Sequence, residues 1–380
     1  MAPFRTPGLA ASADDAASYA FLKPSLSIHI ATATGSRCRR ALNWRDRCWF
    51  LLGILAQVLL VAAVAVYAFG QVAISTPVYS DYLRNIIADW WGVPGPDGHI
   101  EMVVPTYFIL FGVIPVLLSL LLAELTVYQS NLRRMSSAIM LIVAAFLRRK
   151  PRLKLFRTRI CWFSNGELLF LTFLVGGNVC VFYYRVVPRL RLVHQAHDEA
   201  MELLDNGVKM PLPFERYLKI FAVALGLNCM FNMAFLFLPA TRNCAWMEVL
   251  NISYANGIKY HRWLGVLTII SAVGHCAGFY WAYLLEGTWR DKCLPCFDCD
   301  LDSPRGRRVW LNVFGELALL IFVMIGITSI PWVRRKMYNL FYYVHQLFVL
   351  SVIFLVMHWE PSIWWLAPTF ALYVISRSLS

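Results

Sequence analysis

Apolar residues along this chain form long, nearly unbroken stretches. Eight of them are long enough, or nearly so, to cross the roughly 30 Å hydrocarbon core of a bilayer as a helix of about 20 residues. They are 49–70, 103–127, 166–184, 217–239, 258–284, 311–332, 339–359 and 362–378. None shows the alternation of a membrane β-barrel. The pattern therefore predicts an all-α fold: a polytopic membrane helical bundle with about eight transmembrane helices.

A shorter apolar stretch, Ser136 to Leu147, lies between arginines and is expected to rest on the membrane surface. Composition supports the membrane assignment. Of the 380 residues, 59% are hydrophobic and 15% are charged, whereas soluble domains carry about 25% charged residues. These values exclude a soluble globular protein.

The formal net charge is +13, and many of the basic residues are concentrated in a few segments between the spans. Five arginines lie from Arg37 to Arg47, just before the first span, and nine basic residues with no acidic one lie from Arg133 to Arg159. Arg334, Arg335 and Lys336 follow the sixth span. Because cytosolic loops are enriched in Lys and Arg, both termini are predicted to be cytosolic. The same rule explains the basic charge, so no nucleic-acid partner is expected.

Four of the eight histidines lie inside two predicted spans. His261 and His275 are 14 residues apart on one span, and His345 and His358 are 13 apart on another. An ionisable side chain inside a membrane helix is costly and indicates function. At about 1.5 Å per residue, each pair covers roughly 20 Å. Zinc or copper would need clustered ligands, so the spacing favours two stacked haems, each with two histidine ligands.

The predicted orientation assigns the partners, because both spans run from the cytosolic to the outer side. We expect His261 to pair with His345 near the cytosol, and His275 with His358 near the outer face. At about 100° per residue, 14 residues return a side chain to nearly the same face, whereas 13 leave it roughly 140° away. An irregularity is therefore expected between Gln346 and Met357: a kink, a π-bulge or different histidine rotamers.

Several motifs surround these histidines: Lys259-Tyr-His-Arg-Trp-Leu-Gly265 with His275, Gly315-Glu316 through Thr328-Ser329, Arg334 to Met337, Phe341-Tyr-Tyr-Val-His345, and Pro239 to Asn243. Together they resemble the ferric reductase and NADPH oxidase superfamily. The resemblance covers about 166–378, and the two extra N-terminal spans make the layout most similar to plant-type ferric-chelate reductases. It departs at Gln346, where a second histidine is common, and at the exit motif Ser376–Ser378.

The composition, the spans and the resemblance together predict a division into three parts. Residues 1–47 would be a disordered cytosolic tail, and 48–165 would hold two additional transmembrane helices and a basic cytosolic loop. Residues 166–380 would form a six-helix haem-binding ferric reductase-like domain. The implied cofactors are two haem b groups. FAD and NADPH are expected only through a missing domain or a partner, since no dinucleotide-binding motif is found.

Other residues have candidate roles. Arg242 and Arg262 are predicted to neutralise haem propionates, the alternative being ordinary cytosolic arginines. Glu316 is a candidate for charge or proton uptake, the alternative being a pairing with a neighbouring group. Phe348 and Phe354 are candidates for filling the gap between haems, with packing as the alternative. Cys293, Cys296 and Cys299 are expected to supply one disulfide in an outer loop, with metal capture as the alternative. The outer-loop pair His194 and His197 is a weak metal signal.

These observations predict a membrane oxidoreductase that carries electrons from a cytosolic flavin/NADPH reductase domain or subunit to an outer acceptor. A ferric chelate is the favoured acceptor, and dioxygen, giving superoxide, is the alternative. A haem-free, proton-relaying transporter or channel is the alternative of another class. The expected location is the plasma membrane, with an organelle membrane as the alternative, and the lipid bilayer is a partner in either case.

Overall fold

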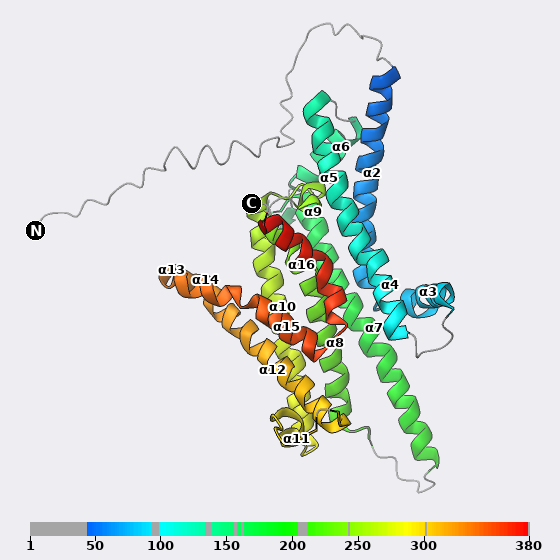
Figure 1. Ribbon diagram of the computed structural model, residues 1–380, viewed down its shortest axis with the longest axis vertical. Coiled ribbons are helices and arrows are strands. Elements are labelled where there is room, and N and C mark those ends of the chain that lie inside the picture. The colour runs from blue at the N-terminus through cyan, green and yellow to red at the C-terminus, as the bar shows by residue number, and fades with distance from the viewer. Residues whose placement is uncertain are drawn as a thin grey trace, which may run out of the picture.

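The computed structural model describes residues 44–92, 99–133, 138–151, 153–155, 158–160, 163–203, 211–241, 244–300 and 302–378 (Figure 1). Within them, seven helical segments are long and apolar enough to cross a membrane: Arg47–Ala73, Glu101–Leu125, Asn165–Glu202, Phe214–Ala240, Tyr254–Leu285, Pro304–Ser329 and Tyr338–His358. The predicted polytopic helical bundle is thereby confirmed. The eighth stretch forms α16 (Ser362–Ser378), whose 17 residues rise about 26 Å, slightly less than the hydrocarbon core.

The N-terminal part contains two long helices, α2 (Trp44–Ala73) and α5 (Ile114–Arg133), which lie side by side. Between them the chain forms short helices and π-helical turns rather than one regular span: η1 (Val78–Leu83), α3 (Arg84–Trp91), η2 (His99–Val103), α4 (Val104–Phe108) and η3 (Ile109–Val113). After α5 come α6 (Ala138–Arg148) and two antiparallel three-residue strands, β1 (Leu153–Leu155) and β2 (Thr158–Ile160). This small hairpin was not expected in an all-α chain.

The C-terminal part carries the histidines. Its elements are α7 (Asn165–Leu203), α8 (Phe214–Leu236), η4 (Leu238–Ala240), α9 (Ala245–Val249), α10 (Tyr254–Leu285), α11 (Trp289–Cys293), α12 (Pro304–Ser329), α13 (Pro331–Lys336), α14 (Tyr338–Gln346), α15 (Phe348–His358) and α16. We call the end that carries α11 the disulfide end, and the opposite end the α9 end (Figure 1).

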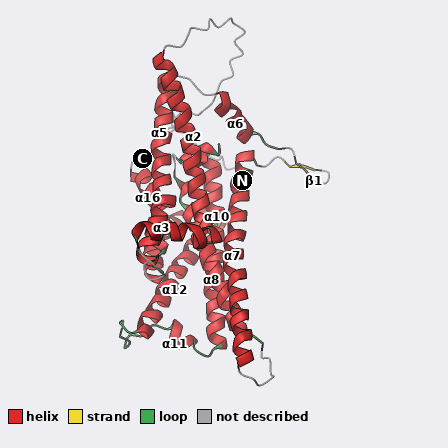
Figure 2. Cartoon of the chain, turned by 90° about the vertical axis from the view of Figure 1, so that its right-hand side faces the viewer, coloured by secondary structure: helices red, strands yellow, loops and turns green. Residues whose placement is uncertain are grey.

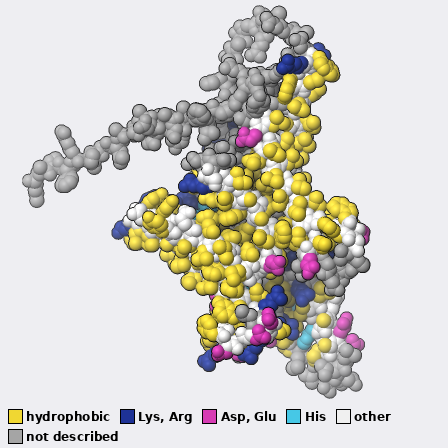
Figure 3. All heavy atoms as spheres, viewed as in Figure 1, with side chains coloured by type: hydrophobic (Ala, Val, Ile, Leu, Met, Phe, Trp, Pro, Cys, Tyr) yellow, Lys and Arg dark blue, Asp and Glu magenta, His cyan; other side chains and the backbone are white. Residues whose placement is uncertain are grey.

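Helix α8 lies at the centre of the bundle, and its span is the most buried of the seven, at 61%. Polar groups tie neighbouring helices to it. The Tyr67 hydroxyl of α2 donates to the Ala234 carbonyl at 2.8 Å, and the amides of Asn178 and Asn232 exchange two hydrogen bonds at 2.8 and 3.0 Å. Away from this centre, apolar side chains cover the middle of the molecule, with charged groups towards its ends (Figure 3). That surface suits a bilayer, which solvates apolar side chains.

Helix α7 differs from the prediction. The apolar stretch 166–184 predicts a span ending before Arg185, with His194 and His197 in a loop. Instead the helix continues to Leu203, and both histidines lie on it. Its 39 residues rise about 58 Å and run down the bundle to the disulfide end (Figure 2). Arginine ends an apolar stretch but is a good helix former, so it does not end a helix. The apolar pattern therefore marked the end of the membrane-like segment and not the end of the helix.

Candidate functional site

The structure brings the four membrane histidines together as two facing pairs. His261 on α10 faces His345 on α14, with 6.2 Å between ring centroids and 66° between ring planes. His275 on α10 faces His358 on α15 at 6.1 Å and 79°. These are the partners that the predicted orientation requires, at two levels along α10.

Backbone carbonyls orient three of the four rings. Nδ1 of His261 lies 2.9 Å from the Leu236 carbonyl oxygen, Nδ1 of His275 lies 2.8 Å from that of Ala222, and Nδ1 of His358 lies 2.7 Å from that of Leu311. A carbonyl only accepts, so Nδ1 must carry the proton and donate. The lone pair of each neutral ring is then on Nε2, the tautomer of a metal-ligating histidine.

The ring spacing fits a metal ion held between two imidazoles. Two metal–nitrogen bonds of about 2.0 Å, together with the two ring radii, place the ring centroids about 6 Å apart. Both pairs have this separation. No group of three or more His, Cys, Asp or Glu side chains that could hold a metal ion occurs in the described residues, whereas structural and catalytic zinc sites take three or four protein ligands. Two ligands per site suit the axial positions of a haem.

Two glycines allow neighbouring helices to pass close to the rings of one pair. A Cβ atom at Gly226 on α8 would lie 2.6 Å from Nδ1 of His275, and one at Gly315 on α12 would lie 2.7 Å from Nδ1 of His358. Any larger residue would push the ring away. Gly315 belongs to a motif that marked the family resemblance, but nothing in the sequence indicated Gly226, because its role depends on a contact between helices.

The predicted irregularity is present at Leu347, where the helix breaks between α14 and α15. The Leu347 N–H donates to the Val344 carbonyl at 3.1 Å, a tighter turn than the α-helical pattern, and regular bonding resumes with Ser351 N–H to the Leu347 carbonyl at 2.9 Å. The break lies between His345 and His358, and the rings of both residues face histidines of α10.

The other candidate residues occupy varied positions. Arg242 falls outside the described residues, and its role stays a prediction. Arg262 is exposed on α10 beside His261. Glu316 accepts a hydrogen bond from the Tyr280 hydroxyl at 2.7 Å. The two phenylalanines pack against aromatic rings: Phe348 contacts Phe237, Phe370 and Tyr373, and Phe354 stacks on Phe314.

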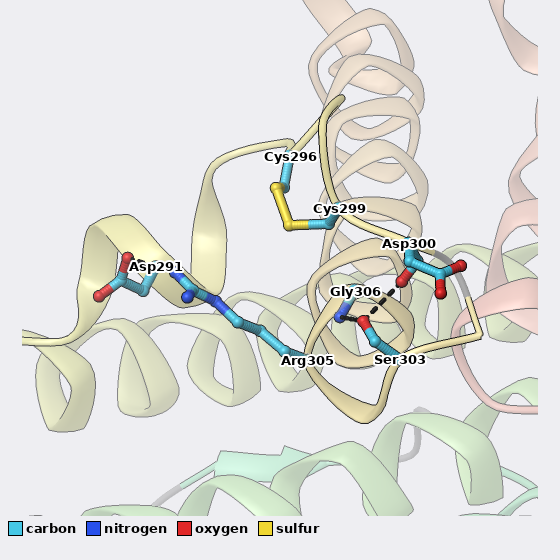
Figure 4. Close-up of a disulfide and its surroundings, with 7 residues drawn as sticks. All are labelled: Asp291, Cys296, Cys299, Asp300, Ser303, Arg305 and Gly306. Atoms are coloured by element: carbon cyan, nitrogen blue, oxygen red, sulfur yellow. Dashed lines mark hydrogen bonds and ion pairs between the residues drawn. A yellow bond between two sulfur atoms is a disulfide. The ribbon is translucent and has the colours of Figure 1, made fainter.

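The cysteine cluster forms one disulfide, Cys296–Cys299 (Figure 4). Cys293 is a buried free thiol. The disulfide interpretation is therefore confirmed. The loop then turns into α12, where the Ser303 hydroxyl oxygen caps the helix by accepting from the Gly306 N–H at 3.1 Å. Nearby, Arg305 forms an exposed ion pair with Asp291 at 3.0 Å.

Glu286, just after α10 at the disulfide end, joins three elements. Lys219 of α8 and Lys292 of α11 both pair with its carboxylate, the latter at 2.8 Å. Burial disfavours the charged carboxylate, but hydrogen bonds from the two lysines outweigh this and lower the pKa of Glu286 to about 2. The ionised carboxylate thus fixes α11 against α8 and α10.

The helices that carry the histidines are similar to parts of known proteins. Residues 225–356, from within α8 to near the end of α15, match the model for "Ferric reductase like transmembrane component", and this range includes His261, His275 and His345. Ferric reduction oxidase 2 of Arabidopsis thaliana is 28% identical over 191 residues, which are 48% of this chain and 22% of the relative. Ferric reduction oxidase 5 of the same plant is 30% identical over 221 residues, 56% of this chain and 27% of the relative.

A fungal protein, the probable ferric reductase transmembrane component of Eremothecium gossypii, is 30% identical over 111 residues, 29% of this chain and 14% of the relative. In all three relatives the matched part is less than a third of the protein. Residues 225–356 are therefore similar to the ferric reductase-like transmembrane family, and two of these relatives are plant ferric reduction oxidases.

Proposed function

We propose that this chain is a transmembrane electron conduit that holds two haem b groups and passes electrons to a ferric chelate. The observation that carries the proposal is the pair of facing histidine sites, with Nδ1 of His261, His275 and His358 bonded to backbone carbonyls. The pair His261 and His345 and the pair His275 and His358 would each hold one haem iron. When bound, haem supplies one-electron chemistry at iron.

The protein residues would orient the rings and exclude water from between the helices. The Leu236, Ala222 and Leu311 carbonyls fix ring orientation and make the ligands more basic. Arg262 would neutralise a propionate at the level of His261 through a charge-assisted hydrogen bond. We place this level towards the cytosol, following the basic loops, and the disulfide end towards the outside, where disulfides persist.

A cytosolic flavin and NADPH-dependent domain or subunit would supply the electrons. The favoured acceptor is a ferric chelate because the relatives are named ferric reduction oxidases and a ferric reductase component. Dioxygen is the alternative acceptor, and the product of one-electron transfer would then be superoxide.

The test begins with purified, haem-supplemented protein and its visible spectrum on reduction by dithionite. Two haems per chain are expected, and His275→Ala should lose one of them. His194→Ala is the matched control, since His194 lies on α7 and contacts Tyr217 instead of a paired histidine. A spectrum without haem bands would contradict the proposal.

The acceptor is tested by mixing the reduced protein with ferric citrate without oxygen, and separately with oxygenated buffer. Reoxidation should be faster with ferric citrate at matched concentrations. Superoxide formation that outpaces chelate reduction would assign the alternative acceptor.

A further inference from the structure

A pocket at the disulfide end lies directly behind one histidine of the second pair. It has a volume of about 340 Å³ and is lined by Asp302, Arg307, Trp310, Leu311 and Phe314. Four of these residues follow the i, i+3, i+4, i+7 spacing of a single face of α12, and Asp302 precedes the helix. The volume is at the lower end of the range of small-molecule sites, about 300–1,000 Å³.

The lining of the pocket is continuous with the His358 site. The carbonyl of Leu311 accepts the hydrogen bond from Nδ1 of His358 at 2.7 Å. Phe314 stacks on Phe354, one helical turn before His358, with ring planes 10° apart. Trp310 contacts Phe314 at 6.0 Å between ring centroids. A molecule in the pocket would therefore sit against the aromatic and backbone groups that hold the ring.

The pocket also carries two opposite charges. Arg307 and Asp302 are exposed, and in the described part of the chain neither belongs to an ion pair. Arg305, on the same first turns of α12, differs because it is committed to Asp291 at 3.0 Å (Figure 4). A guanidinium and a carboxylate beside aromatic walls suit a ligand that has both anionic groups and a positive centre.

We propose that this pocket is the acceptor site and that it selects a carboxylate chelate of ferric iron with little net charge. Arg307 binds a carboxylate of the chelate, and Asp302 faces the metal and disfavours chelates with surplus negative charge. The inference rests on the proposed function. In the step at this site, one electron passes from the reduced conduit to the chelate and converts Fe(III) to Fe(II). No bond forms or breaks, and no proton is transferred. A neutral diatomic acceptor would need neither charge.

The experiment reduces the purified haem-loaded chain with dithionite and follows its reoxidation by stopped-flow absorbance. Arg307→Gln should raise the half-saturating concentration of ferric citrate about fivefold, the effect of one exposed charge pair. Arg305→Gln is the matched control, since it removes an equal charge two residues away, outside the pocket lining, and should leave this value unchanged.

A cationic probe, hexaammineruthenium(III), tests the sign of the charges. Asp302→Asn should raise its half-saturating concentration, and Arg307→Gln should lower it. Equal behaviour of the Arg307→Gln and Arg305→Gln variants with both probes would overturn the pocket assignment while leaving the electron conduit intact.

The haem spectrum is the second readout. Arg307→Gln should keep two haems with an unchanged spectrum. Loss or shift of one haem in this variant would assign Arg307 to the haem site and overturn its role in acceptor binding. A wild-type chain without haem bands would instead contradict the proposed function itself.

Discussion

The rings of His275 and His358 each lie against a glycine, which leaves no room for a Cβ atom at either contact. Gly226→Ala or Gly315→Ala would introduce a Cβ atom 2.6 or 2.7 Å from the respective Nδ1, closer than real Cβ contacts, so the ring must move and lose its carbonyl partner. We expect each variant to lose one of the two haems of the proposed function, measured by reduced-minus-oxidised spectra and haem content.

Gly176→Ala is the matched control for these variants. It lies within α7, where a Cβ atom would meet no neighbouring heavy atom within 4 Å among the described residues. It should keep both haems and, because alanine favours helix, should not lower the melting temperature. Full haem content in Gly226→Ala and Gly315→Ala would contradict the close approach.

Glu167 links the start of α7 to α10 beside His261. Its carboxylate accepts from the Ser164 N–H at 2.6 Å and from the Tyr260 hydroxyl at 2.8 Å, and the Ser164 hydroxyl accepts from the Glu167 N–H at 3.2 Å. The Ser164 and Glu167 bonds form a capping box, and Tyr260 connects it to the histidine helix.

Tyr260→Phe should destabilise the protein by about 1–3 kcal/mol, because it leaves a buried carboxylate oxygen without its donor. The measurement is thermal unfolding in detergent. Tyr254→Phe at the exposed start of the same helix should have little effect, since Tyr254 is 48% exposed. A Tyr260→Phe variant as stable as Tyr254→Phe would refute the link.

The Glu286 site predicts a pH dependence of stability. Its pKa is lowered from 4.5 to about 2 by the two lysines, against the effect of burial. A lowered folded-state pKa stabilises the protein above the unfolded value of 4.5, and this stabilisation disappears as the pH falls towards 2. The melting temperature of Glu286→Gln should therefore be below wild type at pH 6, and the difference should shrink at pH 3. A difference independent of pH would show that the carboxylate charge is not involved.

The position of a helix could be predicted from the sequence where a continuous apolar stretch coincides with the helix. The stretches at 49–70, 217–239 and 258–284 correspond to α2, α8 and α10 within a few residues. The stretch 103–127 predicted one regular span, but the chain there contains π-helical turns around α4, which begins with Val104-Pro105. Proline removes a backbone donor, and a hydropathy pattern carries no information about the resulting hydrogen bonds.

The histidine partners followed from spacing and direction, because 14 residues bring His275 back to the face of His261. The break at Leu347 also followed, since 13 residues do not. The carbonyl partners and Gly226 could not be found this way. They depend on how α8 and α12 pack against α10 and α15, and sequence periodicity says which face a residue occupies but not which backbone atom it meets.

The extension of α7 can be checked by hydrogen–deuterium exchange. Amides from Arg189 to His197 should be protected, because they lie in continuous helix, whereas a loop would exchange at once. Leu192→Pro should remove that protection locally, since proline lacks the donor and clashes with the preceding turn. Immediate exchange in the wild-type chain would restore the loop interpretation.

The orientation of the entire molecule can be tested at the Cys296–Cys299 disulfide. After mild reduction in intact cells, a membrane-impermeant thiol reagent should label these cysteines from outside. A Cys296→Ser/Cys299→Ser variant serves as the control for labelling elsewhere. Labelling only after permeabilisation would place the disulfide end in the cytosol and invert the predicted topology.

The extension of α7 also separates basic from acidic residues at the disulfide end, and this separation produces an electric field along the helix. Arg185, Arg189 and Arg191 lie along the first part of the extension, and Asp198, Glu199 and Glu202 lie near its tip. The acidic C-terminal end of α7 therefore repels anions, and the basic segment from Arg185 to Arg191 attracts them. The two groups of charges are up to about 25 Å apart along the helix. This separation exceeds the roughly 8 Å Debye length at physiological ionic strength, so the two groups act separately on a nearby ion. An anionic solute approaching this end would be guided past the tip towards the membrane surface, and the rate of its encounter would fall as salt is added.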